Sequence, residues 1–114
     1  MIHYEIYNEN AEEALVLVHG FGGSTRTRKK QIDAFSKDYK VIAIDLPGHG
    51  QSQNGEVQEI SAELISDSIN DVLDTLGIEK AHFVGLSLGS MVAVDYAIKN
   101  PERVSRLVLG GAVL

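Results

Sequence analysis

The sequence predicts an α/β fold, a mostly parallel sheet of about five strands with helices on both faces. Short aliphatic and β-branched runs, typical of strands buried on both faces, recur along the chain. From residue 14 onward, segments with helical spacing of apolar residues separate these runs. Such alternation requires parallel strands joined by right-handed crossovers. At 114 residues, with no internal repeat or linker, the chain fits one domain.

Five segments have the composition of strands. Residues 2–7 alternate only loosely between apolar and polar side chains and end at the turn-forming run 8–10, so we expect them at a sheet edge. The other four are mainly apolar, and each is followed by glycine or proline within a few residues. They are residues 14–18, 41–44, 81–84 and 104–109.

Three segments have helical patterns: residues 25–36, 61–76 and 88–100. Gly77 is placed to end the second, and Pro101 forces the third to end at Asn100. On the first helix we expect an inward face of Ile32, Ala34 and Phe35. Apolar positions recur on the second at Ile65, Ile69, Val72, Leu73 and Leu76, and the third runs from Leu88 through Met91, Val92, Tyr96 and Ile98.

Residues 85–89 read Gly-Leu-Ser-Leu-Gly and fit the pattern G-x-S-x-G between a predicted strand and a predicted helix. This context is typical of a nucleophile elbow, in which small residues let strand and helix pass closely. We therefore predict Ser87 to be a catalytic nucleophile with strained backbone angles and φ > 0. The alternative is that a tight turn merely needs a small residue there.

Residues 19–24 (HGFGGS) follow one buried strand and precede a helix. Their glycines permit a tight turn, and an exposed amide here can point toward a ligand above the sheet. In acyl transfer two such amides hold the oxyanion, and we expect them to be the N–H groups of Phe21 and Leu88. The alternative is a purely structural turn.

The remaining polar motifs favour structural roles. Residues 45–52 (DLPGHGQS) predict a rigid turn at the rim of the site rather than chemistry by Asp45 or His49. The cations in 26–30 predict a solvated face, or else an approach for an anionic substrate or partner. We expect His19 to order its loop. His3 and His82 lack acidic partners at ligand spacing, so we predict packing or surface roles and no metal site.

Composition excludes several classes of function. Sixteen acidic against ten basic residues give a net charge of −6, which argues against nucleic-acid binding. The chain has no cysteine, hence no disulfide framework or thiolate metal site. No secretory leader is recognisable, and no apolar run approaches the ~18 residues of a membrane span. We therefore predict a cytoplasmic protein with no membrane partner.

Together these residues resemble the α/β-hydrolase family. Residues 19–23 look like its oxyanion loop, 45–52 like its D-x-P-G-x-G-x-S turn, 85–89 like its nucleophile elbow and 100–104 (NPERV) like the lead into its sixth strand, all in family order. The resemblance implies that residues 1–114 form the N-terminal part of such a domain, ending after the sixth family strand. It points to the cytoplasmic group of small esterases, enol-lactonases, C–C bond hydrolases and the menaquinone-pathway lyase.

The resemblance also implies an incomplete triad. Family members carry serine, then an acid, then histidine along the chain, yet all four histidines here precede Ser87. Asp95 and Glu102 are the only later carboxylates, and neither matches the triad acid by motif. The cap, the acid and the histidine would belong to an absent second half. We expect a serine hydrolase acting through an acyl-enzyme on an ester, thioester or lactone, without a cofactor, and inactive as this chain alone.

Three hypotheses remain open: an N-terminal fragment of an ordinary hydrolase, a half-enzyme completed by another chain that bears the acid and histidine, and a non-catalytic binding or assembly module. The expected partners are a small acyl substrate and either the missing C-terminal half or a second copy. A second copy would form a two-fold homodimer at the exposed edge of residues 104–109, either by antiparallel pairing of these strands or by exchange of terminal elements.

Overall fold

The computed structural model describes residues 3–18, 25–44, 62–86 and 88–110. Within these ranges five strands, three α-helices and one short 3-10 helix follow one another. They are β1 (Tyr4–Tyr7), β2 (Ala14–Val18), α1 (Thr25–Phe35), β3 (Lys40–Ile44), α2 (Ala62–Thr75), β4 (Ala81–Leu86), α3 (Leu88–Lys99), η2 (Pro101–Arg103) and β5 (Val104–Gly110).

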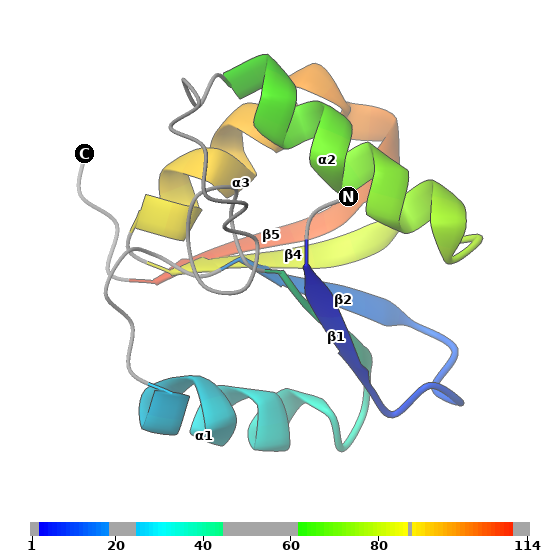
Figure 1. Ribbon diagram of the computed structural model, residues 1–114, viewed down its shortest axis with the longest axis vertical. Helices are drawn as coiled ribbons and strands as arrows, with labels where there is room; N and C mark the ends of the chain where they lie inside the picture. The colour runs from blue at the N-terminus through cyan, green and yellow to red at the C-terminus, as the bar shows by residue number, and fades with distance from the viewer. Residues whose placement is uncertain (1–2, 19–24, 45–61, 87, 111–114) are drawn as a thin grey trace.

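The strands form one sheet in the order β1-β3-β2-β4-β5 (Figure 1). β1 runs antiparallel to β3 at one edge, and the other pairs are parallel. Val16 in the central strand lies opposite Ile42 on one side and Phe83 on the other. The predicted fold class, a mostly parallel sheet of about five strands with the first strand at an edge, is confirmed.

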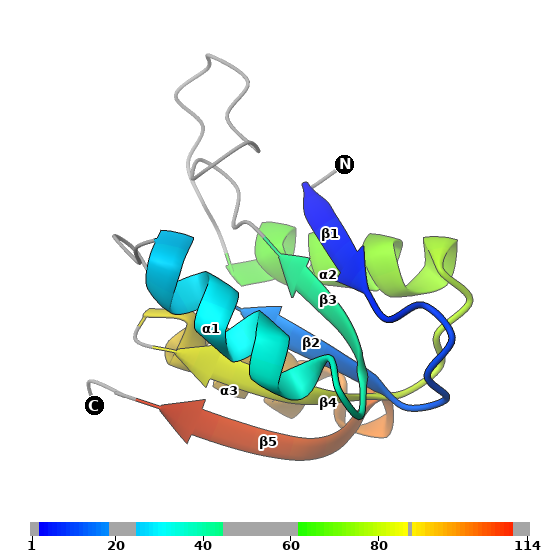
Figure 2. The ribbon, with the colours of Figure 1, turned by 90° about the horizontal axis from the view of Figure 1, so that it is seen from below.

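Helices cover both faces of the sheet. α1 lies on one face, whereas α2 and α3 lie on the other (Figures 1 and 2). Alternate residues of β2 accordingly enter two separate cores: Leu15 and Leu17 pack on the α1 side, while Val16 and Val18 pack on the α2 and α3 side. All of β2 is buried, as its continuous apolar run predicted.

Gly77 ends α2 as predicted. It has φ of 69°, a conformation that glycine adopts without steric cost. Its N–H donates to the carbonyl of Asp74 at 3.1 Å, and the N–H of Ile78 donates to the carbonyl of Leu73 at 2.8 Å. These two bonds make a Schellman cap, and the side chains of Ile78 and Leu73 share the core beneath it.

The predicted inward face of the first helix was partly wrong. Ala34 is exposed on α1, because it lies about 200° around the helix from the buried Ile32. On α3 the side chains of Met91 and Ile98 are 54% and 73% exposed. The face of α3 that meets the sheet consists instead of small residues and one tyrosine: Gly89, Ser90, Ala93 and Tyr96.

β5 differs from the other parallel strands because none of its residues is buried. An irregularity in its pairing with β4 determines which face of the sheet each β5 side chain lies on. Ala81 lies opposite Val104, but Phe83 lies opposite Leu107, so β5 holds one extra residue.

In the described part of the chain no helix is long and apolar enough to cross a membrane.

Candidate active site

The predicted nucleophile elbow coincides with the junction of β4 and α3. β4 ends at Leu86 and α3 begins at Leu88, so the sequence position of Ser87 is the connection between them. Ser87 and Phe21 themselves lie outside the described residues. Their roles, and the predicted φ > 0 at Ser87, therefore stay predictions.

Gly85 shows how closely strand and helix approach beside that position. A Cβ added to it would lie 2.6 Å from the carbonyl oxygen of Gly89, 2.7 Å from the Cα of Ser90 and 2.9 Å from the Cβ of Ala93. Two of these three atoms belong to the backbone, which cannot move aside easily. Gly85 is thus required for space, as a nucleophile elbow demands.

The small face of α3 sits over the end of β4 that leads to Ser87. Further along the same face Tyr96 stacks on Phe83, with ring centroids 4.9 Å apart and an interplanar angle of 25°. The side chains on this face therefore increase in size along α3, from glycine to tyrosine. The N-terminal end of the helix lies closest to β4. Leu88 is the first residue of α3, where backbone N–H groups have no acceptor within the helix. That position suits the predicted oxyanion donor.

The three strands that precede the motif segments end at the same edge of the sheet. Val18, the last residue of β2, lies opposite Ile44, the last residue of β3, and opposite Gly85 on its other side. Because the three strands are parallel, the segments 19–24 and 45–52 and the position of Ser87 all follow carboxyl ends of neighbouring strands. This is where open α/β sheets bind ligands.

Two described histidines lie elsewhere. His82 is near the amino end of β4 on the α1 side, with its Nε2 3.8 Å from Glu13 Oε1 and its ring edge-on to Tyr39 at 5.4 Å. This environment fits the predicted packing role. His3 is half-buried next to β1. Among the described residues no group of three His, Cys, Asp or Glu side chains could hold a metal ion. Asp45, His19 and His49 lie outside the described part.

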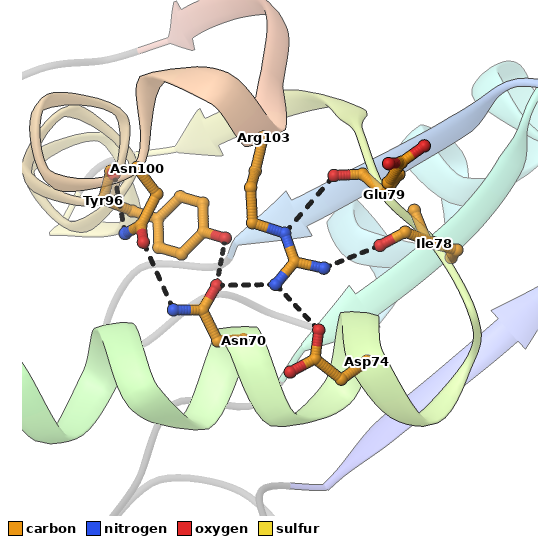
Figure 3. A network of polar contacts seen from close by, with 7 residues as sticks. All are labelled: Asn70, Asp74, Ile78, Glu79, Tyr96, Asn100 and Arg103. Carbon is orange, nitrogen blue, oxygen red and sulfur yellow. Dashed lines mark hydrogen bonds and ion pairs between the residues drawn. The ribbon is translucent and has the colours of Figure 1, made fainter.

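A polar network holds the opposite end of α3 (Figure 3). The Tyr96 hydroxyl donates to Asn70 Oδ1 at 2.7 Å, and Arg103 Nη1 donates to the same oxygen at 3.1 Å. Nη1 also pairs with Asp74 Oδ1 at 2.8 Å. Asn70 Nδ2 donates to Asn100 Oδ1 at 3.2 Å, and Asn100 Nδ2 to the Tyr96 carbonyl at 3.2 Å. α2, α3 and η2 are thereby tied together.

Arg103 completes the network by binding the segment that connects α2 to β4. Its Nη2 donates to the carbonyl of Ile78 at 2.7 Å and its Nε to the carbonyl of Glu79 at 3.3 Å. A guanidinium suits this task because it is planar and always charged. Sequence reasoning missed the network. The available signal was the spacing of four residues between Asn70 and Asp74 and between Tyr96 and Asn100, which puts each polar pair on one helix face.

Tyr96 is a donor throughout the physiological range. Burial raises the pKa of its hydroxyl to about 12, the positive charge of Arg103 opposes that shift, and the carboxylates of Glu102 and Asp74 add to it. The phenol therefore stays protonated and keeps its bond to Asn70. The network stabilises the fold at the base of the sheet, remote from the predicted chemistry.

Comparison with known proteins identifies the family. The family model for the alpha/beta hydrolase fold matches residues 13–113. A 2-hydroxy-6-oxononadienedioate/2-hydroxy-6-oxononatrienedioate hydrolase from Paraburkholderia phymatum is 42% identical over 111 residues, covering 92% of this chain and 38% of the relative.

Solved structures agree. The meta-cleavage product hydrolase from Pseudomonas fluorescens superposes with a TM-score of 0.85 at 36% identity, over 97% of this chain and 41% of that one. A probable hydrolytic enzyme from Pseudomonas aeruginosa gives a TM-score of 0.89 at 28% identity, over 98% of this chain and 37% of that one. The chain thus spans less than half the length of these relatives. It belongs to the α/β-hydrolase family.

Proposed function

We propose that this chain supplies the nucleophile and the oxyanion hole of a serine hydrolase. In this proposal Ser87 Oγ attacks a substrate carbonyl, and the N–H groups of Phe21 and Leu88 hold the resulting oxyanion. The observation that carries the proposal is the contact of Gly85 with the backbone of α3, because it is the close strand–helix approach that an elbow requires.

The chemistry then proceeds through two acyl transfers. Collapse of the first tetrahedral intermediate expels the leaving group and leaves an acyl ester on Ser87, which water hydrolyses in a second step of the same kind. Both steps need a base that takes the proton of the attacking hydroxyl and returns it to the leaving group. No histidine follows Ser87 in the 114 residues. In the family order, then, the acid and the histidine must come from residues beyond these or from another chain.

The substrate class has two sources of support. The elbow and the two amides suit esters, thioesters and lactones, which all present a carbonyl to the serine. Two relatives at 42% and 43% identity are named as hydrolases of an oxo-dioate, a substrate with two carboxylates. Lys29 and Lys30 on α1 are exposed and follow the segment 19–24, so an anionic substrate is compatible with this rim.

A fusion protein tests the nucleophile. Residues 1–114 would be joined to the C-terminal remainder of the Paraburkholderia phymatum hydrolase, which brings the rest of a hydrolase domain. We expect the fusion to hydrolyse p-nitrophenyl acetate, and Ser87→Ala to lower kcat about 10³-fold or more.

Ser36→Ala is the matched control, because within the described part of the chain the Ser36 hydroxyl makes one long bond, of 3.4 Å, to the Asp33 carbonyl. A folded Ser87→Ala fusion with unchanged turnover would refute the proposal. A phosphonate probe gives an independent readout, since its adduct should map to Ser87 by mass spectrometry.

A second candidate function, a non-catalytic or partner-completed half-domain, is favoured by the missing base. The unfused 114-residue chain should then hydrolyse the activated ester no faster than its Ser87→Ala variant. Turnover far above that variant would show that a residue of this chain replaces the histidine, and His49 would be examined first. Co-purification of a chain that bears the acid and histidine would favour the partner-completed reading.

A further inference from the structure

Asn70 joins three elements of the fold with one side chain (Figure 3). Its Oδ1 accepts hydrogen bonds from the Tyr96 hydroxyl at 2.7 Å and from Arg103 Nη1 at 3.1 Å. Its Nδ2 donates to Asn100 Oδ1 at 3.2 Å. Tyr96 lies in α3, Asn100 directly follows that helix, and Arg103 belongs to η2. Asn70 therefore binds the C-terminal end of α3 at two points about one helical turn apart.

α2 gives Asn70 a rigid support. The neighbouring side chains of Ile69, Val72 and Leu73 are fully buried in the core that α2 shares with the sheet. The two bonds at Gly77 hold the C-terminal end of the same helix. A side chain that projects from so well-packed a helix can hold a neighbouring element in a defined place.

The contacts between α3 and β4 oppose one movement of the helix only weakly. The small residues of α3 approach Gly85 closely, but small side chains form shallow ridges that interdigitate little. Tyr96 stacks on Phe83 with ring planes 25° apart, and stacked rings tolerate a range of offsets. These contacts fix the distance between helix and strand. The hydrogen bonds of Asn70 are directional, so they fix the position of α3 along its axis.

A slip of α3 along its axis would reach the proposed catalytic groups. Tyr96 lies eight residues after Leu88, about 12 Å along the helix, and backbone hydrogen bonds make a helix stiff in this direction. Ser87 directly precedes Leu88, so both residues would move with the helix. Phe21, the second proposed oxyanion donor, follows β2 and does not belong to α3. A slip would therefore change the distance between the two donors.

We propose that Asn70 is a positioning residue, which fixes α3 along its axis and so keeps the two oxyanion donors in register. It thereby aligns Ser87 and the N–H of Leu88 with the N–H of Phe21. This inference rests on the proposed serine-hydrolase function. Oxyanion donors act when they lie about 3 Å from the oxygen, and catalytic groups lose their effect when displaced by more than about 0.5 Å.

Kinetics of the fusion protein test this role. Asn70→Leu has a similar size and removes all three bonds, so it should lower kcat for p-nitrophenyl acetate about 10-fold. Its KM should change less than about twofold, because both acyl transfers use the same oxyanion hole and slow together. Tyr96→Phe removes one bond and should lower kcat about threefold. Because both variants break the same link, the double variant should be no slower than Asn70→Leu alone.

Two control variants separate positioning from a loss of stability. Ser68→Ala removes a bond within α2, from the Ser68 hydroxyl to the Leu64 carbonyl at 2.8 Å. Ile6→Ala weakens the core at β1, which β3 and β2 separate from β4 in the sheet. Both variants should keep the kcat of the unaltered fusion at a temperature where circular dichroism shows every variant to be folded.

Nuclear magnetic resonance gives a readout that needs no turnover. In the 114-residue chain Asn70→Leu should shift the amide resonances of Gly89 and Ser90, at least about 9 Å along α3 from Tyr96, by more than Ile6→Ala does. Tyr96→Phe keeps the aromatic ring over Phe83 and covers the case in which Asn70→Leu does not fold. It should shift the same resonances in the same direction.

Three results would overturn the proposal. An unchanged kcat for Asn70→Leu would show that the network only stabilises the fold. A higher KM at constant kcat would assign Asn70 to substrate binding, and an equal loss of kcat in Ile6→Ala would indicate general loosening. Failure of the proposed function is recognised separately, because Ser87→Ala would then turn over as fast as the unaltered fusion. The resonances of Gly89 and Ser90 report on the position of α3 in either case.

Discussion

β2 and β5 are both parallel neighbours of β4, yet their surroundings are opposite. All five residues of β2 are buried, whereas none of the seven residues of β5 is. In the described part of the chain β2 has a strand on each side and helices on both faces, while β5 pairs with β4 alone. β-propensity therefore predicts that both segments are strands, but their place in the sheet decides how much each contributes to stability.

The two ends of α3 make a second contrast. At its N-terminal end the described residues that approach Gly85 of β4 are Gly89, Ser90 and Ala93, and their small size lets the helix lie close to the strand. At its C-terminal end Tyr96 and Asn100 take part in a network of directed polar bonds. Small side chains at the N-terminal end of α3 therefore allow the helix to lie close to the sheet. Hydrogen bonds at its C-terminal end fix its orientation.

The largest difference should appear between leucines of the two strands. Leu17→Ala in β2 removes a fully buried side chain and should lower the free energy of unfolding by about 3 kcal/mol. Leu107→Ala in β5 removes a partly exposed one and should lower it by less than about 1 kcal/mol. Urea denaturation at low protein concentration, where any dimer is dissociated, measures both values. Equal losses would show that β5 is as well packed as β2.

Two glycines give the next largest contrast. Gly85→Ala would press a Cβ into the α3 backbone and should lower the free energy of unfolding by about 2–3 kcal/mol. Gly110→Ala is the control on β5, where among the described residues the new Cβ would meet Leu86 Cδ2 at 2.8 Å, the far end of a flexible side chain. We expect less than about 1 kcal/mol there. If both variants unfolded alike in urea, close approach at the elbow would not explain the glycine at 85.

Much of this architecture could be predicted from local sequence. The apolar runs located all five strands, and Gly77 and Pro101 located helix ends to within one or two residues. These features depend on neighbouring residues alone. The exposure of Ala34, Met91 and Ile98 could not be predicted in the same way, since apolar character alone does not determine which side of a short helix packs against the sheet.

Features that depend on contacts between distant parts of the sequence could not be predicted. The bonds of the network join residues up to 33 positions apart, and nothing local marks Asn70 as the partner of Arg103. The extra residue in β5 that turns Leu107 and Leu109 toward α3 also depends on pairing with β4. At the candidate site the glycine requirement was predictable from the elbow motif, while the roles of Ser87, Phe21 and Leu88 remain predictions.

Arg103 and Arg106 lie three residues apart but should contribute very differently to the free energy of unfolding. Arg103→Met leaves the Asp74 carboxylate and the carbonyls of Ile78 and Glu79 without their donor, and should lower the free energy of unfolding by about 2 kcal/mol. Arg106→Met, at an exposed position of β5, should change it by less than about 0.5 kcal/mol. Thermal unfolding in parallel would compare them. A small loss for Arg103→Met would mean that water replaces the guanidinium.

Tyr96→Phe should give the smallest change at neutral pH and a distinctive one in alkali. Losing the bond to Asn70 should lower the free energy of unfolding by about 1 kcal/mol. Burial in the folded chain raises the pKa of Tyr96 from its ordinary value of 10.0 to about 12. The folded chain therefore holds the phenol proton more tightly than the unfolded chain does. This stabilisation is complete below pH 10 and is lost as the pH rises through about 12.

Urea titrations between pH 9 and 12 should therefore show that the free energy of unfolding declines more steeply with pH for the unaltered chain than for Tyr96→Phe. Tyr39→Phe serves as the control for ionisation of a tyrosine outside the network. Parallel curves for all three proteins would show that the phenol of Tyr96 ionises as readily when folded as when unfolded, and that burial at the base of α3 does not hold its proton.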